Sequence, residues 1–247
     1  PIRSPSGADS RSCPGVVIEG DVSIGAGSVI KAYSMVQRWT RLGERNQVGP
    51  HAVLGGAPQH TAYDGYETWL NIGDDNDFRE FVTVSRAFER GAETRIGSNC
   101  LFMGLSHVAH DCILGDNISM ANYSVLAGHI EVGSNCVFSG YAGGHQFIRI
   151  GKFCMLGPHT VLRKDVVPFT LVAEHPARHY RLNSIGLKRN GVTGDRYKAL
   201  EQAFRALRSG DQELKGIPDT EETRYLKDWL AADSRFGILP FAKPGKR

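Results

Sequence analysis

The sequence of 247 residues lacks features that several large classes of protein require. No stretch reaches the roughly 18 consecutive apolar residues of a transmembrane helix, so we expect no integral membrane segment. The formal net charge is only +3, an excess too small to indicate a nucleic-acid partner. The opening stretch "PIRSPSGADSRSCPG" has no apolar core typical of a secretory signal. We therefore predict a cytoplasmic protein.

Cysteine is scarce as well. The chain has five cysteines, an odd number, and none of them forms a CxxC pair. Disulfides and paired-cysteine metal sites are therefore not expected. Cys100, Cys112, Cys136 and Cys154 each lie four residues after an aliphatic residue, and we interpret them as small apolar residues of the core.

Glycine, by contrast, is abundant, with 29 residues, and it accompanies a period of six. Aliphatic residues occupy every sixth position from Ile18 to Leu54, and the same phase resumes at Ile72 and continues, with breaks, to Leu162. Neither a helix nor an amphipathic strand has this period. Such hexads predict a parallel β-helix, in which three hexads form one triangular coil of 18 residues. We expect the small residue after each aliphatic one to allow a tight corner, because glycine tolerates positive φ.

The ends and breaks of the period define the predicted domains. The phase fails at 60–71 and 85–95, where we expect loops that leave the coil. We predict a mainly β fold, with a lead-in over 1–14, a left-handed parallel β-helix over 15–167, and a connector with a small C-terminal α-helical domain over 168–247.

Two stretches of this last domain have helical spacing. "TGDRYKALEQAFRALRSG" predicts a helix that ends at Gly210. "DTEETRYLKDWLAA" predicts a second helix, with Thr220 as its N-cap.

A group of histidines forms the candidate site. The stretch "GLSHVAHDC" places His107, His110 and Asp111 close together. Residues 18 apart stack about 4.8 Å apart in such a coil, which brings further polar residues to the same edge of the prism: His129, His145 and Gln146.

This cluster allows three interpretations. A zinc site needs three or four converging ligands, whereas a general base needs one imidazole held by a carboxylate. Asp111 can hold His110 only if the chain turns there, because adjacent residues of a strand point to opposite faces. We favour catalysis without a metal, with a metal site and simple packing as the alternatives.

The hexads together with "HVAHDC", "LAGHIEVG", "GGHQF" and "NSIGLKRNG" resemble the family of acyl-ACP–UDP-N-acetylglucosamine O-acyltransferases that begin lipid A synthesis. The resemblance covers nearly the whole chain. It implies a homotrimer with active sites between neighbouring β-helices. It also implies an acyl carrier protein as partner, whose phosphopantetheine carries a 3-hydroxyacyl chain to the 3-position of a UDP-amino sugar. No other cofactor is implied.

The resemblance assigns roles to individual residues. His110 matches the general base, Asp111 the residue that orients it, and Gly128 the backbone donor to the oxyanion. Pro158 falls where a residue sets acyl-chain length. The positions that match substrate contacts are His60, His107, His129, His145, Gln146, Asn183 and Arg189. Six lysines and arginines between 163 and 189, against two carboxylates, suit a diphosphate and an acidic carrier protein.

The sequence departs from the family pattern mainly at acceptor contacts. His60 and Ala62 stand where the family has an Asp and a Lys, and Ile185 stands where it has a Glu. Pro158 replaces a Gly, and Ser85 replaces a His. Acyl transfer is therefore predicted more firmly than the sugar. The alternatives are N-acylation of a 3-amino sugar, a CoA- or ACP-dependent transferase acting on another nucleotide sugar, and a non-catalytic hexapeptide-repeat scaffold.

Overall fold

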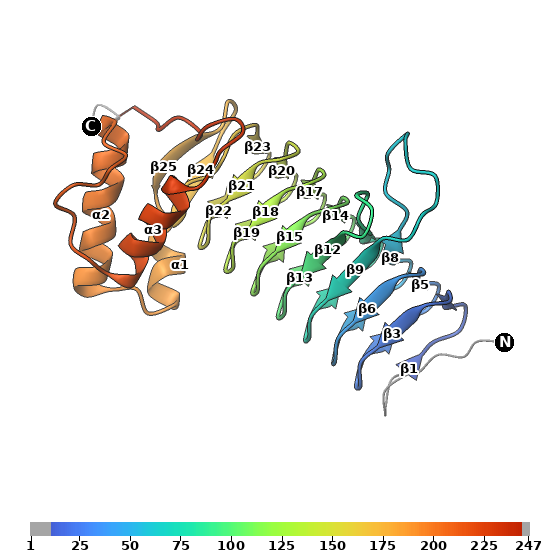
Figure 1. Ribbon diagram of the computed structural model, residues 1–247. Helices are drawn as coiled ribbons and strands as arrows, with labels where there is room; N and C mark the ends of the chain where they lie inside the picture. Colours follow the sequence, from blue (N-terminus) through green and yellow to red (C-terminus); the bar gives the residue numbers. More distant parts are fainter. Residues whose placement is uncertain (1–10, 244–247) are drawn as a thin grey trace.

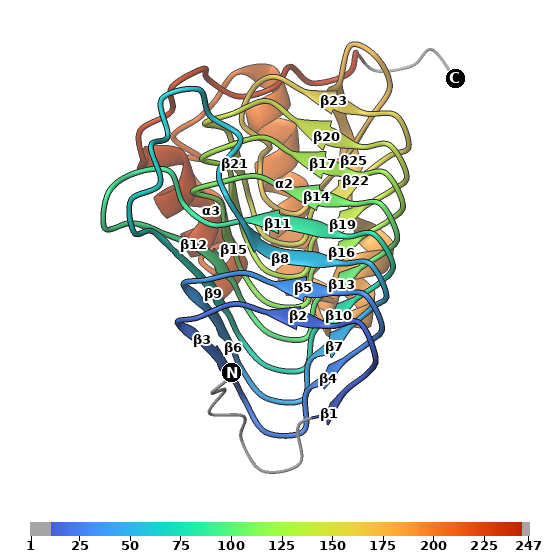
Figure 2. The same ribbon diagram turned by 90° about the vertical axis from the view of Figure 1, so that its right-hand side faces the viewer.

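Short parallel strands stacked in a ladder make up most of the computed structural model, which describes residues 11–243 (Figure 1). The chain visits three sheets in turn, so the stack is a triangular prism. Figure 2 looks onto the second sheet, whose eight strands form successive rungs. The helices lie at the end of the prism opposite the N-terminal strands (Figure 1). The predicted β-helix fold with a helical C-terminal part is confirmed.

Each sheet takes its strands from successive coils. The first sheet contains β1 (Arg11–Ser12), β4 (Val29–Ile30), β7 (Gln47–Val48), β10 (Asp77–Phe78), β13 (Leu101–Phe102), β16 (Ser119–Met120), β19 (Val137–Phe138), β22 (Met155–Leu156), β24 (Thr170–Ala173) and β25 (Arg178–Leu182). The second sheet contains β2 (Val17–Ile18), β5 (Met35–Val36), β8 (Val53–Gly56), β11 (Thr83–Ser85), β14 (His107–Val108), β17 (Val125–Leu126), β20 (Gly143–Gly144) and β23 (Val161–Leu162). The third sheet contains β3 (Val22–Ile24), β6 (Thr40–Leu42), β9 (Trp69–Ile72), β12 (Glu93–Ile96), β15 (Ile113–Leu114), β18 (Glu131–Val132) and β21 (Arg149–Ile150).

Two loops interrupt the regular coils. The first loop, residues 57–68, joins β8 to β9, and the second loop, residues 86–92, joins β11 to β12. Both leave the prism at the edge between the second and third sheets (Figure 2). Strand pairing already begins with β1, which pairs with β4 ahead of the expected start at residue 15.

The inward hexad positions form one continuous apolar core along the prism. Phe78, Phe102 and Phe138 are fully buried, and the rings of Phe78 and Phe102 stack 4.8 Å apart. Burying such a side chain stabilises the fold by roughly 1.5–3 kcal/mol. The aliphatic period therefore accounts for the fold energetically as well as geometrically.

The four predicted core cysteines are buried and reduced. Burial raises the pKa of the Cys100 thiol to about 11 and that of Cys112 to about 12. Both thiols therefore stay protonated at neutral pH, as expected of core residues.

The glycine after each aliphatic residue has a different role from the predicted one. Positive φ falls three residues after the aliphatic residue, as at Gly27, Asn99 and Asp111. Gly97, which directly follows Ile96, does not have positive φ, but a Cβ there would lie 2.7 Å from the backbone of Gly115 on the next coil. Our expectation was wrong because close approach between coils, rather than a left-handed conformation, requires glycine here.

Three helices cover the end of the prism: α1 (Ser184–Arg189), α2 (Gly194–Ser209) and α3 (Glu221–Ala231). Gly210 ends α2 with φ 97°, and Thr220 caps α3 through a capping box with Thr223, as the sequence predicts. Buried Phe204, Leu207 and Leu226 belong to a second apolar core. The region expected to be only a connector also contains β24, β25 and α1.

After α3 the chain returns to the prism. Isolated bridges join Ile238 to Asp165 and Phe241 to His179. This C-terminal segment therefore fixes the helices to the last coils and passes close to the edge that carries the histidines.

Candidate active site

His110 and Asp111 lie side by side at the edge between the second and third sheets. Asp111 has φ 59° and follows β14 in a corner, so the two consecutive side chains point the same way. His110 Nδ1 lies 2.7 Å from Asp111 Oδ2, and only 9% of His110 is exposed. The turn that the interpretation required is present.

The second loop holds the carboxylate of Asp111. The backbone N–H groups of Phe88 and Glu89 donate to its two oxygens at 2.9 and 3.3 Å. Burial opposes ionisation of Asp111, but the hydrogen bonds from His110, Phe88 and Glu89 outweigh it and lower its pKa. An ionised Asp111 accepts a hydrogen bond from Nδ1–H of neutral His110, which leaves Nε2 of His110 as a proton acceptor.

Gly128 lies directly against the His110 ring. A Cβ at Gly128 would lie 2.6 Å from His110 Cε1 and 3.0 Å from Nε2. Among residues 11–243, no acceptor pairs with the Gly128 N–H. A free backbone donor on the residue that packs against the imidazole is suited to stabilise negative charge that develops during acyl transfer.

His129 and His60 complete the surroundings of His110. The His129 ring meets the His110 ring edge-on at 5.2 Å, and its Nε2 lies 3.7 Å from Asp111 Oδ2. Burial is the main cause of the lowered pKa of His129. His60 approaches from the first loop, with its ring 6.0 Å from that of His110 and 3.9 Å from that of Phe88.

Three other predicted residues lie on neighbouring strands and corners. His107, on β14, is hydrogen-bonded through Nδ1 to Thr83 Oγ1 at 2.7 Å, and burial lowers its pKa. Gln146 lies one coil beyond Gly128, 18 residues later in the chain. Its carbonyl oxygen lies 3.2 Å from Nδ1 of the preceding residue, His145.

Within one chain, the remaining predicted residues lie outside this cluster. Asn183 is the N-cap of α1, where its Oδ1 accepts from Gly186 N–H and its Nδ2 donates to Phe153 O. Arg189 ends the same helix. Pro158 is exposed at the corner between the first and second sheets.

The same side chains could in principle bind a metal. His110, Asp111 and His129 each offer a ligand atom, and these atoms lie within 4.8 Å of one another. However, His110 and two backbone N–H groups already bind the Asp111 carboxylate. The arrangement therefore suits an oriented imidazole base better than a metal centre.

Several residues beside this site are not among those that the sequence predicts. A cavity of about 600 Å³ adjoins Asp111 and His129 and is also lined by Phe147 and Arg235. Phe147 lies 18 residues after His129, so the period could have identified it. The 18-residue period does not relate Arg235 or Phe88 to the site residues, so no sequence signal identifies them.

The stacked hexads define a hexapeptide-repeat protein, and the histidine–aspartate pair at a prism edge is its candidate site. A family model described as Udp N-acetylglucosamine O-acyltransferase, domain 2, matches residues 165–239. The chain is similar to two proteins named acyl-(acyl-carrier-protein)–UDP-N-acetylglucosamine O-acyltransferase. The protein from Synechocystis is 44% identical over 72% of this chain, a match that spans 64% of the relative's own length, slightly less than two thirds. The protein from Gloeothece citriformis is 38% identical over 77% of this chain and 72% of its own.

A solved structure agrees with these relatives. The UDP-N-acetylglucosamine O-acyltransferase of Moraxella catarrhalis superposes with a TM-score of 0.88 at 32% identity, covering 95% of each chain. The chain belongs to the acyl-(acyl-carrier-protein)–UDP-N-acetylglucosamine O-acyltransferase family. Among the described residues, none of the helices has the length and apolarity needed to cross a membrane.

Proposed function

We propose that this protein transfers a 3-hydroxyacyl chain from acyl carrier protein to the 3-hydroxyl of UDP-N-acetylglucosamine, the first step of lipid A synthesis. The observation that carries the proposal is the packing of Gly128, whose backbone N–H has no acceptor among residues 11–243, against the ring of a His110 that Asp111 orients. A base and an oxyanion donor are the two groups that this reaction needs.

The reaction follows from these positions. His110 Nε2 takes the proton of the sugar hydroxyl as its oxygen attacks the thioester carbon. The Gly128 N–H donates to the oxyanion that forms. The C–S bond then breaks, and the phosphopantetheine thiolate takes the proton from His110. The products are an ester and a free thiol, and His110 returns to its neutral form.

The oligomer we propose is a homotrimer, in which a neighbouring β-helix completes each site. The second sheet presents no charged residue at its outward strand positions, which are Val17, Met35, Val53, Thr83, His107, Val125, Gly143 and Val161. The outward positions of the third sheet are mostly charged or polar: Ser23, Arg41, Trp69, Asn71, Glu93, Arg95, Ile113, Glu131 and Arg149. Of these two sheets, the uncharged second sheet is the better candidate for burial between subunits.

A trimer would also account for the residues that one chain leaves apart. His107 lies on the uncharged second sheet, beside His110. A neighbour packed there could supply the outlying Asn183, Arg189 and Pro158 to the same cleft. We assign nucleotide binding to Asn183 and Arg189, and a limit on acyl-chain length to Pro158, on this basis.

The test is acyl transfer from a panel of 3-hydroxyacyl-ACPs to UDP-N-acetylglucosamine. We expect turnover that His110→Ala abolishes. A folded wild-type trimer without turnover would contradict the proposed acceptor. In that case the departures from the family pattern at His60, Ala62 and Ile185 would favour another acceptor, such as a nucleotide sugar with a 3-amino group. The same assay with that acceptor would test this alternative.

A further inference from the structure

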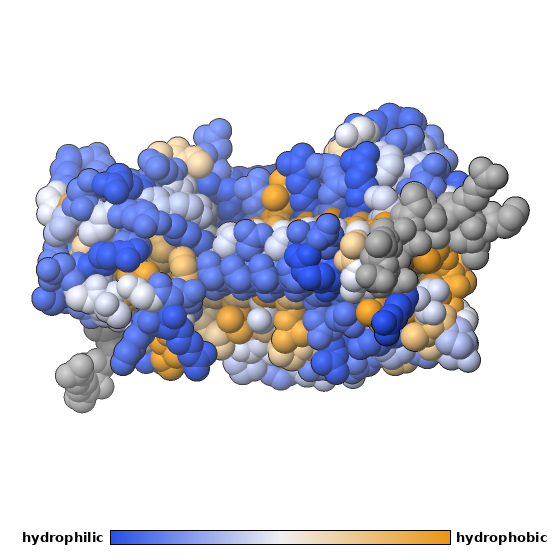
Figure 3. Space-filling view, turned by 90° about the horizontal axis from the view of Figure 1, so that it is seen from below, coloured by the Kyte–Doolittle hydropathy of each residue, from blue (hydrophilic) through white to orange (hydrophobic). Residues whose placement is uncertain are grey.

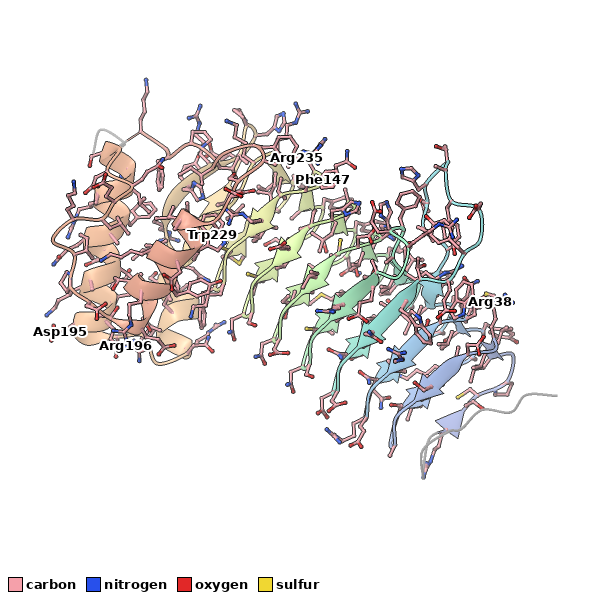
Figure 4. All side chains as sticks on the ribbon, in the orientation of Figure 1. Arg38, Phe147, Asp195, Arg196, Trp229 and Arg235 are labelled. Carbon is pink, nitrogen blue, oxygen red and sulfur yellow. The ribbon has the colours of Figure 1, made fainter. Side chains whose placement is uncertain are left out.

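The cavity of about 600 Å³ beside Asp111 lies where the C-terminal segment returns to the prism. Its remaining walls come from three strands of the third sheet (β15, β18 and β21), from the corner residue Phe147 and from the residues just after α3. The lining residues beyond Asp111 and His129 are Ile113, Glu131, Phe147, Arg149, Asp233, Ser234 and Arg235. Figure 4 shows Arg235 next to Phe147 on the side of the prism that also carries Trp229.

The two arginines of this cavity differ in their partners. Arg149 is bound to the buried carboxylate of Asp165 at 2.9 Å, and it also donates to the carbonyl oxygen of Trp229. Its charge is therefore neutralised. Arg235 has no hydrogen bond or ion pair with any of the residues 11–243. Its guanidinium lies 4.1 Å from the centre of the Phe147 ring.

Stacked rings connect Arg235 to the acid–base pair. The ring of Phe147 stacks on that of His129 at 4.4 Å with an interplanar angle of 11°. His129 in turn contacts the ring of His110 and the carboxylate of Asp111. The guanidinium thus packs at the end of a row of rings that leads to the acid–base pair, and its N–H donors have no partner among residues 11–243. A stacked arginine with free donors is pre-organised to bind an oxyanion.

We propose that Arg235 binds a phosphate group of a substrate in this cavity. The inference rests on the proposed function, in which both substrates carry phosphate: the acceptor as a diphosphate, and the donor as the phosphodiester of phosphopantetheine. Glu131 and Asp233 also line the cavity, so negative charge is favoured only at the Arg235 end. The remaining walls suit the uncharged polar part of the same substrate.

The experiment measures binding rather than turnover, so it does not depend on the proposed reaction. Calorimetry compares UDP with uridine, and 4′-phosphopantetheine with pantetheine, for wild type, Arg235→Ala and Arg235→Lys. Within each pair the two ligands differ only in phosphate. Arg38→Ala is the matched control, because Arg38 is another exposed arginine over an aromatic ring, that of Trp39.

We expect Arg235→Ala to weaken one phosphate-bearing ligand by about 10- to 100-fold, the value of a hydrogen bond to a charged group. Its phosphate-free counterpart and the control should be unchanged, and Arg235→Lys should lose less. The affected pair identifies which substrate is bound. Equal losses with and without phosphate, unchanged binding of both pairs, or no binding of either phosphate ligand to wild type would each overturn the proposal. If the wild-type protein has no transfer activity but Arg235→Ala still weakens binding of a phosphate-bearing ligand, only the proposed reaction is refuted.

Discussion

Asp111 holds His110 in one orientation because its carboxylate is itself held from several sides. It bonds to His110 Nδ1 and accepts from the N–H groups of Phe88 and Glu89. Its own N–H donates to Thr94 Oγ1 at 2.8 Å. A base with a fixed tautomer keeps Nε2 available for the substrate proton, so catalysis should depend on the charge of Asp111 as well as on its shape.

Asp111→Asn tests this dependence. The amide keeps the shape of the carboxylate but removes its charge, so it no longer favours the reactive orientation and tautomer of His110. We expect kcat to fall by about 100-fold or more, with little change in the melting temperature. Asp116→Asn, an exposed aspartate of another corner that accepts from Ser98 N–H, is the control. Activity within a few-fold of wild type in Asp111→Asn would contradict an orienting role.

Gly128→Ala tests the contact between the glycine and the base. The added Cβ would lie 2.6 Å from His110 Cε1, so the imidazole would have to move. Because a misplaced base loses catalysis steeply, we expect kcat to fall by about 100-fold. Gly140→Ala is the matched control, because the nearest atom to its added Cβ is 3.5 Å away. Equal activities of the two variants in the transfer assay would show that the Gly128 contact is unimportant.

His179, on β25, joins the C-terminal segment to the last coils. Its Nε2 accepts from Val167 N–H, and its Nδ1 donates to Leu239 O, both at 3.0 Å. Burial lowers the pKa of His179 from 6.5 to about 4, so the folded state requires the neutral ring. Protonation would remove the acceptor and leave a charge in the core.

This histidine should make the fold sensitive to acid. Because the folded pKa lies below the ordinary value, its contribution is complete above pH 6.5 and is lost as pH falls toward 4. The free energy of unfolding should decrease by up to about 3 kcal/mol over this range. Urea unfolding at pH 7 and pH 4.5 would measure it. In His179→Gln this decrease should be smaller, whereas His175→Gln, at an exposed turn, should retain it. If the free energy of unfolding of His179→Gln decreases as much as that of wild type, His179 is not the source of the acid sensitivity.

The elements differ in how well the sequence predicts them. The coils, α2 and α3 follow from periods and caps within short segments, such as Thr220 and Gly210. The pairing of β24 with β25 and the contacts of His179 depend on segments far apart in the chain. The candidate site divides in the same way. The 18-residue period relates Gly128 to His110 and His129 to Asp111, whereas the Phe88 N–H and Arg235 reach the site from a loop and from the C-terminal segment.

On the scale of the whole molecule, one edge of the prism exposes aromatic and aliphatic side chains to solvent along its length. The corner between the first and second sheets carries a column of largely exposed aromatic and aliphatic side chains: Tyr33, His51, Phe81, Leu105, Tyr123, Tyr141 and His159. Their rings stack at 4.8–5.3 Å. Figure 3 shows that apolar residues also occur along the length of the prism. An exposed column of aromatic and aliphatic side chains beside an uncharged sheet is typical of a subunit interface.

The proposed trimer should therefore depend on the second sheet. Val125 and Val161 each expose 43% of their surface there, and Ile113 exposes 45% on the third sheet. Burying a lysine charge in an interface costs several kcal/mol, so Val125→Lys with Val161→Lys should dissociate the trimer, whereas Ile113→Lys should not. Light scattering should find about 81 kDa, three times 27.1 kDa, for wild type and Ile113→Lys. The double variant should shift toward 27.1 kDa and lose activity because each site loses its second wall. A double variant that stays trimeric would place the interface elsewhere, and a monomeric wild type would refute the trimer itself.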